Sequence, residues 1–154
     1  MILFRLSKTA FAGDLTGKGA EKAGGRWNSA GVPMIYTGSS RALCVLEVAV
    51  HTPLGIMPSD FSLTTFELPD DISISEQSLS KLPAGWNTFP HQHFTQLIGD
   101  AFIRERKDLV LKVPAAVAEG DHNYLVNPLH KDVQKLRILS IEPYRFDKRL
   151  FGLK

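Results

Sequence analysis

The sequence predicts an α+β domain in which a mixed sheet carries only two long helices. Short apolar or alternating runs, typical of strands, recur along the chain, whereas just two segments have the periodicity of long helices. No internal repeat or low-complexity tract interrupts the pattern. A chain of 154 residues is long enough to bury one core, so we expect a single domain spanning residues 1–154.

The first half of the chain predicts three strands and a helix. Residues 1–7 (MILFRLS) alternate like a half-buried strand, and residues 33–38 (PMIYTG) form a short apolar run after a glycine-rich segment. Residues 39–53 predict a helix, because Ser39 or Ser40 can cap its start and Pro53 stops it. A third strand is expected at 61–68 (FSLTTFEL).

The second half begins with residues 70–90, which are polar and punctuated by prolines and are expected to form a loop. Residues 90–107 predict the clearest helix, with Pro90 suited to its first turn. Its apolar stripe is expected to consist of Phe94, Leu97, Ile98, Ala101 and Phe102. Strands are expected at 109–114 and 136–142, joined by a turn-rich connection around HNYLVNPLH, to which spacing alone assigns no role.

The charge and composition exclude several classes of protein. Hydrophobic residues make up 44% of the chain and charged residues 22%, which is ordinary for a globular protein. The net charge is only +2, and the sequence lacks the basic stripe of a nucleic-acid binder. The one dense basic cluster, RERK at 104–107, falls at the expected end of a helix, where cations interact favourably with the helix dipole. No apolar run is long enough for a membrane span and the N-terminus lacks a signal-peptide core, so we expect a cytoplasmic protein.

Glu47 is the first candidate for chemistry. The surrounding run ALCVLEVAV is apolar on every other side, which predicts a helix buried all round that carries one carboxylate into the interior or a cleft wall. A structural interpretation pairs Glu47 with Arg5, Arg41 or His51. A functional interpretation is equally compatible with the pattern, because unusual buried charges also gather at active sites.

Arg26 in the segment GGRWN is the second candidate. Two glycines before an arginine are compatible with a simple tight turn, but a guanidinium also matches the oxygen atoms of phosphate groups. The preceding GDLTGKGA is not a P-loop, because three residues separate Gly13 from Gly17 and Gly19 follows Lys18. A Rossmann fingerprint is also absent from this segment.

Other polar residues give weaker signals. Arg5 interrupts an apolar strand, and alternation alone places it on the solvent side. Cys44 is expected to be an inert core thiol. His91 and His93 are expected to be surface histidines and not metal ligands, because no cysteine or acidic cluster accompanies them.

Taken in order, FRLS, FAGDLTGKGA, GGRWN, IYTG, the VLEV helix, LVLKVPAAV and NYLVNPLH resemble the RES-domain family, the toxins of Xre-RES toxin-antitoxin pairs. The resemblance covers nearly the whole chain. Two departures are visible. FAGDLTGKGA has extra spacing relative to the family's F-x-G-x-G-A, and Ala115 stands where the family commonly has a serine after V-P, which removes a hydroxyl.

The resemblance implies an ADP-ribosyltransferase-like fold, a split and twisted β-sheet with flanking helices around a cleft that holds NAD. It implies an enzyme that consumes NAD as substrate, without a metal, and so arrests growth. Arg5, Arg26, Tyr36 and Glu47 are the implied catalytic residues, and the implied NAD contacts are Arg5, Gly25, Arg26, Trp27, Asn28, Tyr36 and Glu47. A cognate Xre-like DNA-binding antitoxin that blocks the cleft is the implied partner.

The chemistry agrees with these assignments. The nicotinamide-ribose bond already has a cationic leaving group, so its cleavage needs only a carboxylate to stabilise the developing oxocarbenium ion. Glu47 fits that role, the two arginines would bind the pyrophosphate, and Tyr36 would offer either its ring or its hydroxyl. Water, phosphate and a protein side chain all remain possible acceptors. An RNA-directed toxin and a catalytically silent binding module are the alternatives.

Overall fold

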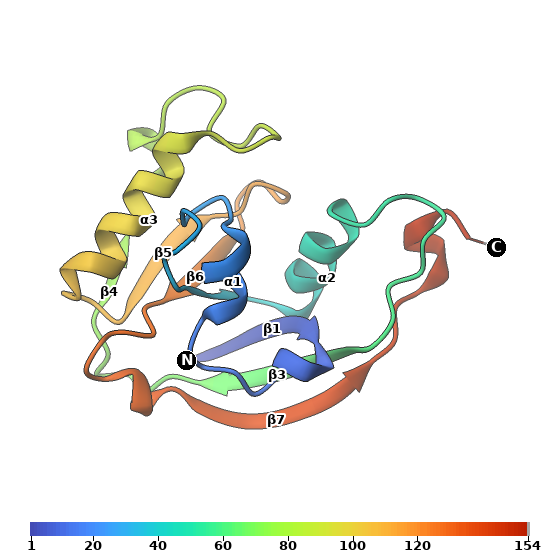
Figure 1. The fold of residues 1–154 in the computed structure, drawn as a ribbon, viewed down its shortest axis with the longest axis horizontal. Coiled ribbons are helices and arrows are strands. Elements are labelled where there is room, and N and C mark those ends of the chain that lie inside the picture. Colours follow the sequence, from blue (N-terminus) through green and yellow to red (C-terminus); the bar gives the residue numbers. More distant parts are fainter. Residues whose placement is uncertain (154) are drawn as a thin grey trace.

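A single sheet of seven strands forms the centre of the computed structural model, which describes residues 1–153 (Figure 1). The strands lie in the order β4-β5-β6-β2-β1-β3-β7, and all neighbours are antiparallel except β4 and β5. Their bounds are β1 Ile2–Lys8, β2 Ile35–Gly38, β3 Phe61–Glu67, β4 Ile74–Glu76, β5 Val110–Pro114, β6 His122–Val126 and β7 Arg137–Tyr144. The mixed sheet confirms the α+β class.

The described residues contain three α-helices: α1 Lys18–Ala23, α2 Arg41–Val50 and α3 His93–Glu105. Short 3-10 turns occupy Thr9–Phe11, Leu79–Lys81, Val133–Lys135 and Lys148–Phe151. None of the helices in this part of the chain has the length and apolar character required to cross a membrane.

The sheet is nearly divided between β1 and β2. Only Phe4 and Gly38 pair across this junction, whereas seven residue pairs join β1 to β3. The strands therefore form two groups, β4-β5-β6-β2 on one side of the junction and β1-β3-β7 on the other, which Figure 1 shows curving apart. This is the split sheet that the family resemblance implies. Helix α2 follows β2 directly and contacts both β1 and β2.

Two clusters of buried side chains stabilise this arrangement. One cluster contains Leu3, Ile35, Phe66 and Val126, together with neighbours from β5 and the connecting loops, and so links the two strand groups. The other packs Trp27 and Met34 against α3 and strands β5 and β6. Burial of such apolar surface is the main stabilising contribution in a domain of this size.

Most strands and both long helices lie where the sequence predicts them. The Ser40 hydroxyl accepts a hydrogen bond from Leu43 N at 3.0 Å, which confirms the expected cap of α2. Three elements were not predicted: α1, which lies in the glycine-rich segment; β4, which lies in the expected loop; and β6, which lies in the expected turn-rich connection. β4 and β6 depend on pairing with other strands, and α1 has only six residues, so local patterns describe these elements poorly.

The predicted buried face of α3 is partly wrong. The helix begins at His93, after Pro90, and its buried residues are Thr95, Gly99, Phe102 and Ile103. Leu97, which was expected in the stripe, is 54% exposed. The reason is a close backbone contact: a Cβ atom at Gly99 would lie 1.6 Å from the carbonyl oxygen of Trp27. The contact with the GGRWN segment therefore places Gly99 on the buried face together with the apolar Phe102 and Ile103, whereas Leu97 is exposed.

Candidate functional site

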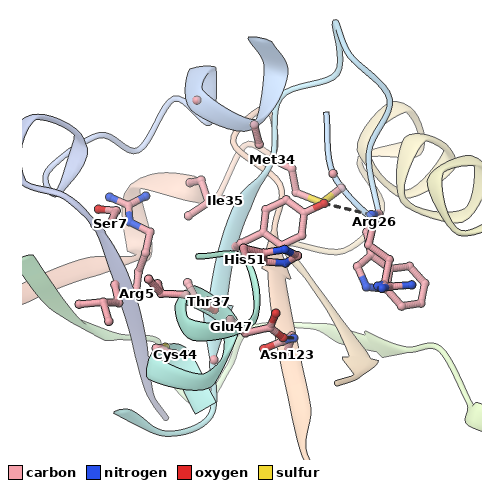
Figure 2. A pocket seen from close by; sticks show the side chains of 18 of the residues that line it. Arg5, Ser7, Arg26, Met34, Ile35, Thr37, Cys44, Glu47, His51 and Asn123 are labelled. Atoms are coloured by element: carbon pink, nitrogen blue, oxygen red, sulfur yellow. Dashed lines mark hydrogen bonds between the residues drawn. The ribbon is translucent and has the colours of Figure 1, made fainter. Parts of the chain in front are cut away.

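A cavity of about 920 Å³ opens beside the junction where β1 and β2 diverge. Its walls come from β1, β2, α1, α2, the segment Gly24–Trp27, the loop around Asn87 and His91, and Asn123 of β6. Figure 2 shows Arg5 and Arg26 on opposite sides of this cavity, with Glu47, His51 and Asn123 between them. Six of the seven predicted site residues line the cavity: Arg5, Gly25, Arg26, Trp27, Tyr36 and Glu47.

The segment GGRWN is a tight hairpin with Arg26 and Trp27 at its tip. Gly25 N donates to Asn28 O at 2.9 Å, and the two residues form an isolated β-bridge. Helix α3 holds this hairpin, because Gln96 Nε2 donates to Gly25 O at 3.0 Å and Asp100 Oδ1 accepts from Ser29 N at 2.9 Å. The hairpin is therefore fixed to α3, and it presents Arg26 to the cavity.

The guanidinium of Arg26 also fixes the opposite loop. Nη1 donates to the carbonyl oxygens of Trp86 at 2.7 Å and Thr88 at 3.1 Å. The rings of Trp27 and Trp86 lie 6.2 Å apart and add a second contact between the two segments. Burial lowers the pKa of Arg26, while the negative charge of Glu47 acts in the opposite direction. Arg26 and Glu47, which have opposite charges, thus line the same cavity.

Tyr36 presents its ring to the cavity and uses its hydroxyl within the protein. The hydroxyl donates to Asn28 Oδ1 at 2.7 Å and accepts from Trp27 N at 3.0 Å. Burial raises the pKa of Tyr36 well above its usual range, so the hydroxyl remains protonated. A Cβ atom at Gly25 would lie 2.7 Å from this hydroxyl, which explains why glycine occupies that position.

Asn28 does not line the cavity. Its side chain is fully buried, and Nδ2 donates to the carbonyl oxygens of Ala20 at 2.9 Å and Val32 at 2.9 Å. With Oδ1 occupied by Tyr36, the amide links α1, the hairpin and β2. Asn28 therefore supports the site from behind the cavity wall.

Glu47 lines the cavity from α2, but the expectation that this helix is buried all round is wrong. Only Leu43 and Cys44 are buried in α2, whereas Leu46 and Val50 are exposed and Glu47 is half-buried. The helix packs against β1 and β2 with one face, and its opposite face is exposed.

The structural pairing proposed for Glu47 is also absent. Within residues 1–153, no ion pair involves Glu47, so neither Arg5, Arg41 nor His51 neutralises it. Its hydrogen-bond partner is a neutral amide: Asn123 Nδ2 donates to Glu47 Oε1 at 2.7 Å. The carboxylate is thus held by a neutral group and not by a cation.

Alternation alone suggested that Arg5 lies on the solvent side of its strand. In the structure, Arg5 lines the cavity. Nη1 donates to Asp14 O at 2.8 Å, and Nη2 donates to Phe11 O at 2.9 Å and Ala12 O at 2.7 Å. Burial lowers the pKa of Arg5, and the Asp14 carboxylate acts in the opposite direction. The arginine therefore holds residues 11–14 as one wall of the cavity.

Three cavity residues were missed by the sequence analysis. Asn123 lies on β6, the strand that was mistaken for a turn-rich connection. His91 was expected on the surface but lines the cavity. Burial lowers the pKa of His91 there, and the nearby charges of Arg26 and His51 lower it further. Phe89 is 75% exposed, and its ring lies 5.9 Å from that of His51 at the cavity mouth. No local pattern marked Phe89, and Asn123 lies in HNYLVNPLH, to which spacing alone assigned no role.

The remaining candidates have structural roles. The Cys44 thiol is buried, donates to Phe4 O at 3.3 Å and has a pKa raised by burial to about 11, as expected for an inert thiol. Ala115 is buried beside the cavity-lining residues Ala116 and Val117. In the part of the chain that the structure describes, no group of three or more His, Cys, Asp or Glu side chains is arranged to hold a metal.

Known proteins are similar to this chain in sequence, and a solved structure is similar to it in fold. The chain is 39% identical to "Toxin Res" of Pseudomonas putida over 155 residues, which cover 98% of this chain and 100% of that protein. It is 33% identical to "Prs ADP-ribosylating toxin" of Sphingobium sp. over 146 residues, which cover 94% of this chain and 91% of that protein.

A solved structure gives the same fold assignment. The toxin-antitoxin complex MbcT-MbcA of M. tuberculosis contains a chain that matches with a TM-score of 0.73 and 21% identity. The match covers 98% of this chain and 86% of that one, so the two share a fold. The model of the RES domain matches residues 2–147. With its split sheet and the GGRWN hairpin beside the cavity, the chain belongs to the RES domain family.

Proposed function

We propose that this protein is the toxin of a toxin-antitoxin pair and that it consumes NAD by breaking the nicotinamide-ribose bond. The observation that carries the proposal is the Glu47 carboxylate, which lines a cavity of about 920 Å³, is held by the neutral amide of Asn123 and forms no ion pair within residues 1–153. A carboxylate that lines a cavity without an ion-pair partner is more common at functional sites than in structural networks, so its presence favours a role in chemistry. The size of the cavity is within the range of small-molecule sites.

The proposed reaction uses this charge directly. The bond between ribose C1′ and the nicotinamide nitrogen breaks, its electron pair leaves with nicotinamide, and the positively charged pyridinium becomes a neutral base. The positive charge passes to the ribose ring, where Glu47 stabilises the oxocarbenium ion. An acceptor nucleophile then attacks C1′ and loses its proton to solvent. No general acid is needed, because the leaving group departs as a neutral molecule.

The other site residues would orient the substrate. Arg26 keeps Nε and Nη2 without a described partner among residues 1–153, so these atoms can donate to the phosphates while Nη1 holds the loop. Tyr36 would contribute its ring, since its hydroxyl is already used. Both Nη atoms of Arg5 donate to carbonyls, so Arg5 would act by shaping the wall and by its charge. Trp27 and Gly25 complete the surface beside Arg26.

The names of the relatives support a toxin that acts on NAD and leave the acceptor open. One relative is called an ADP-ribosylating toxin, which favours a protein acceptor, whereas the others are called Toxin Res. Transfer to a protein is therefore the second candidate. A structural neighbour belongs to a toxin-antitoxin complex, which supports an antitoxin partner. We propose an Xre-like antitoxin that covers this cavity, and action on NAD in the cytoplasm.

Incubation of the purified protein with NAD tests the proposal. Chromatography should show loss of NAD and release of an equal amount of nicotinamide. The second product identifies the acceptor: ADP-ribose for water, its 1″-phosphate for phosphate, and labelled protein when a cell extract is added. NAD that remains intact under all three conditions would contradict the proposal and favour a silent binding module. RNA cleavage in the same extract would favour the RNA-directed alternative.

A further inference from the structure

The hydrogen bond between Glu47 and Asn123 joins residues that lie 76 positions apart in sequence. A carboxylate only accepts hydrogen bonds, so the atom of Asn123 that faces Glu47 at 2.7 Å is the amide nitrogen. Asn123 lies on β6, opposite Gly38 of β2, whereas Glu47 lies on α2, which follows β2. The contact therefore spans β2 and connects the helix to the rigid sheet.

Gly38 makes the contact sterically possible. A Cβ atom at this position would lie 3.0 Å from Cys44 Sγ and 3.6 Å from Asn123 Oδ1. The first distance is shorter than ordinary van der Waals contact, so a side chain at position 38 would force the Cys44 thiol to shift. With glycine at position 38, the second turn of α2 stays close to the sheet and Glu47 reaches Asn123.

Resting on the proposed function, we infer that Asn123 is a positioning residue that orients Glu47 for the reaction. Asn123 holds Oε1, which directs Oε2 toward the cavity. A neutral amide suits this task better than an arginine or a lysine, because it fixes the carboxylate without cancelling the charge that must stabilise the oxocarbenium ion. A misplaced carboxylate would lose much of that stabilisation even if the substrate still bound.

Three substitutions at position 123 separate positioning from packing. Asn123→Ala removes the donor, Asn123→Ser keeps a shorter donor, and Asn123→Asp keeps the shape but faces Glu47 with a second negative charge. We expect kcat for NAD consumption to fall about tenfold in Asn123→Ala and about 100-fold in Asn123→Asp, with Asn123→Ser between the parent and Asn123→Ala. KM should change by less than about threefold in all of them. Gln134→Ala, which removes an exposed amide outside the cavity, is the matched control.

A double-mutant cycle with Glu47→Gln gives the decisive measurement. If Asn123 acts through Glu47, adding Asn123→Ala to the Glu47→Gln protein should leave the residual kcat unchanged. Independent multiplication of the two losses would overturn the inference. So would a parental kcat in Asn123→Asp, because a purely structural role tolerates a residue of the same shape. If one variant fails to fold, as judged by its melting temperature, the kcat values of the remaining position-123 variants still test the predicted order.

The failure of this inference and the failure of the proposed function have different signatures. A parent protein that consumes no NAD overturns both. A parent protein that consumes NAD, with position-123 variants that match the Gln134→Ala control, overturns only the positioning role.

Discussion

The hydroxyl of Tyr36 donates to Asn28 Oδ1 at 2.7 Å and accepts from Trp27 N at 3.0 Å, so its proton is used within the protein. This relationship bears on a question that the sequence left open, whether Tyr36 would act in the proposed reaction through its ring or its hydroxyl. It favours the ring. It also shows that the hydroxyl of a cavity-lining tyrosine stabilises the GGRWN hairpin.

Tyr36→Phe should therefore lower stability more than activity. The change leaves Trp27 N and Asn28 Oδ1 without partners in a buried site, which costs about 1–3 kcal/mol. The ring stays, so kcat should remain within about threefold of the parent. Urea unfolding and NAD consumption measured on one preparation check both statements. A folded Tyr36→Phe protein with no activity would assign the hydroxyl to the reaction, and Tyr36→Ala shows the effect of losing the ring.

Glu47→Gln should abolish turnover and preserve the fold. A neutral amide cannot supply the charge that the oxocarbenium ion needs, so kcat should fall by about 100-fold or more. Because no ion pair of residues 1–153 depends on Glu47, the melting temperature should stay near that of the parent or rise. Glu105→Gln, at the exposed end of α3, is the control. A Glu47→Gln protein with parental turnover would remove Glu47 from the active site.

Arg26→Ala should weaken NAD binding more than Arg26→Lys does. Lysine keeps the positive charge but loses the planar set of donors with which arginine binds phosphate and the two carbonyls of the Trp86 loop together. Calorimetry with NAD, using Glu47→Gln as background to prevent turnover, measures the order. Equal affinities in the parent, Arg26→Lys and Arg26→Ala would rule out a phosphate contact.

Gly99→Ala should disrupt the contact between α3 and the hairpin. The new methyl group would overlap the Trp27 carbonyl oxygen at 1.6 Å, so the backbone must move, at a cost of about 3 kcal/mol. Gly19→Ala, in α1, is the matched control, because a Cβ atom at Gly19 would meet no heavy atom of another part of the protein within 4 Å. Alanine favours helix there by up to about 1 kcal/mol, so Gly19→Ala should be neutral or stabilising. Similar melting temperatures for the two variants would contradict the predicted contact.

We expect the protein to lose stability at alkaline pH because the Cys44 thiol is buried. Burial raises the pKa of its thiol from 9.0 to about 11, so folding favours the protonated form. This contribution is fully present below pH 9 and is lost as pH rises toward 11, by about 2–3 kcal/mol. The free energy of unfolding should therefore fall more steeply in the parent than in Cys44→Ala across this range. Parallel curves would show that the thiol does not titrate differently on folding.

Local sequence determined the elements whose signals lie within a few neighbouring residues. The cap at Ser40 needs only the amide of Leu43, so the start of α2 was predictable. The GGRWN segment was singled out because two glycines and an arginine stand together, and its turn is closed by its own residues, Gly25 and Asn28. The motif order, read as a resemblance, correctly implied the RES family and the split sheet.

The tertiary structure decided which side chains meet at the cavity. Arg5 is on the cavity side because residues 11–14 lie beside it and supply three carbonyl acceptors. The alternation pattern depends only on neighbouring residues of the strand and contains no information about these acceptors. His91 and Phe89 reach the cavity because α3 and the preceding loop pack against the hairpin. Asn123 reaches Glu47 because β6 pairs with β2 and Gly38 leaves room. Strand pairing and close backbone approach involve residues far apart in sequence, so their effect on a side chain is invisible in the residues beside it.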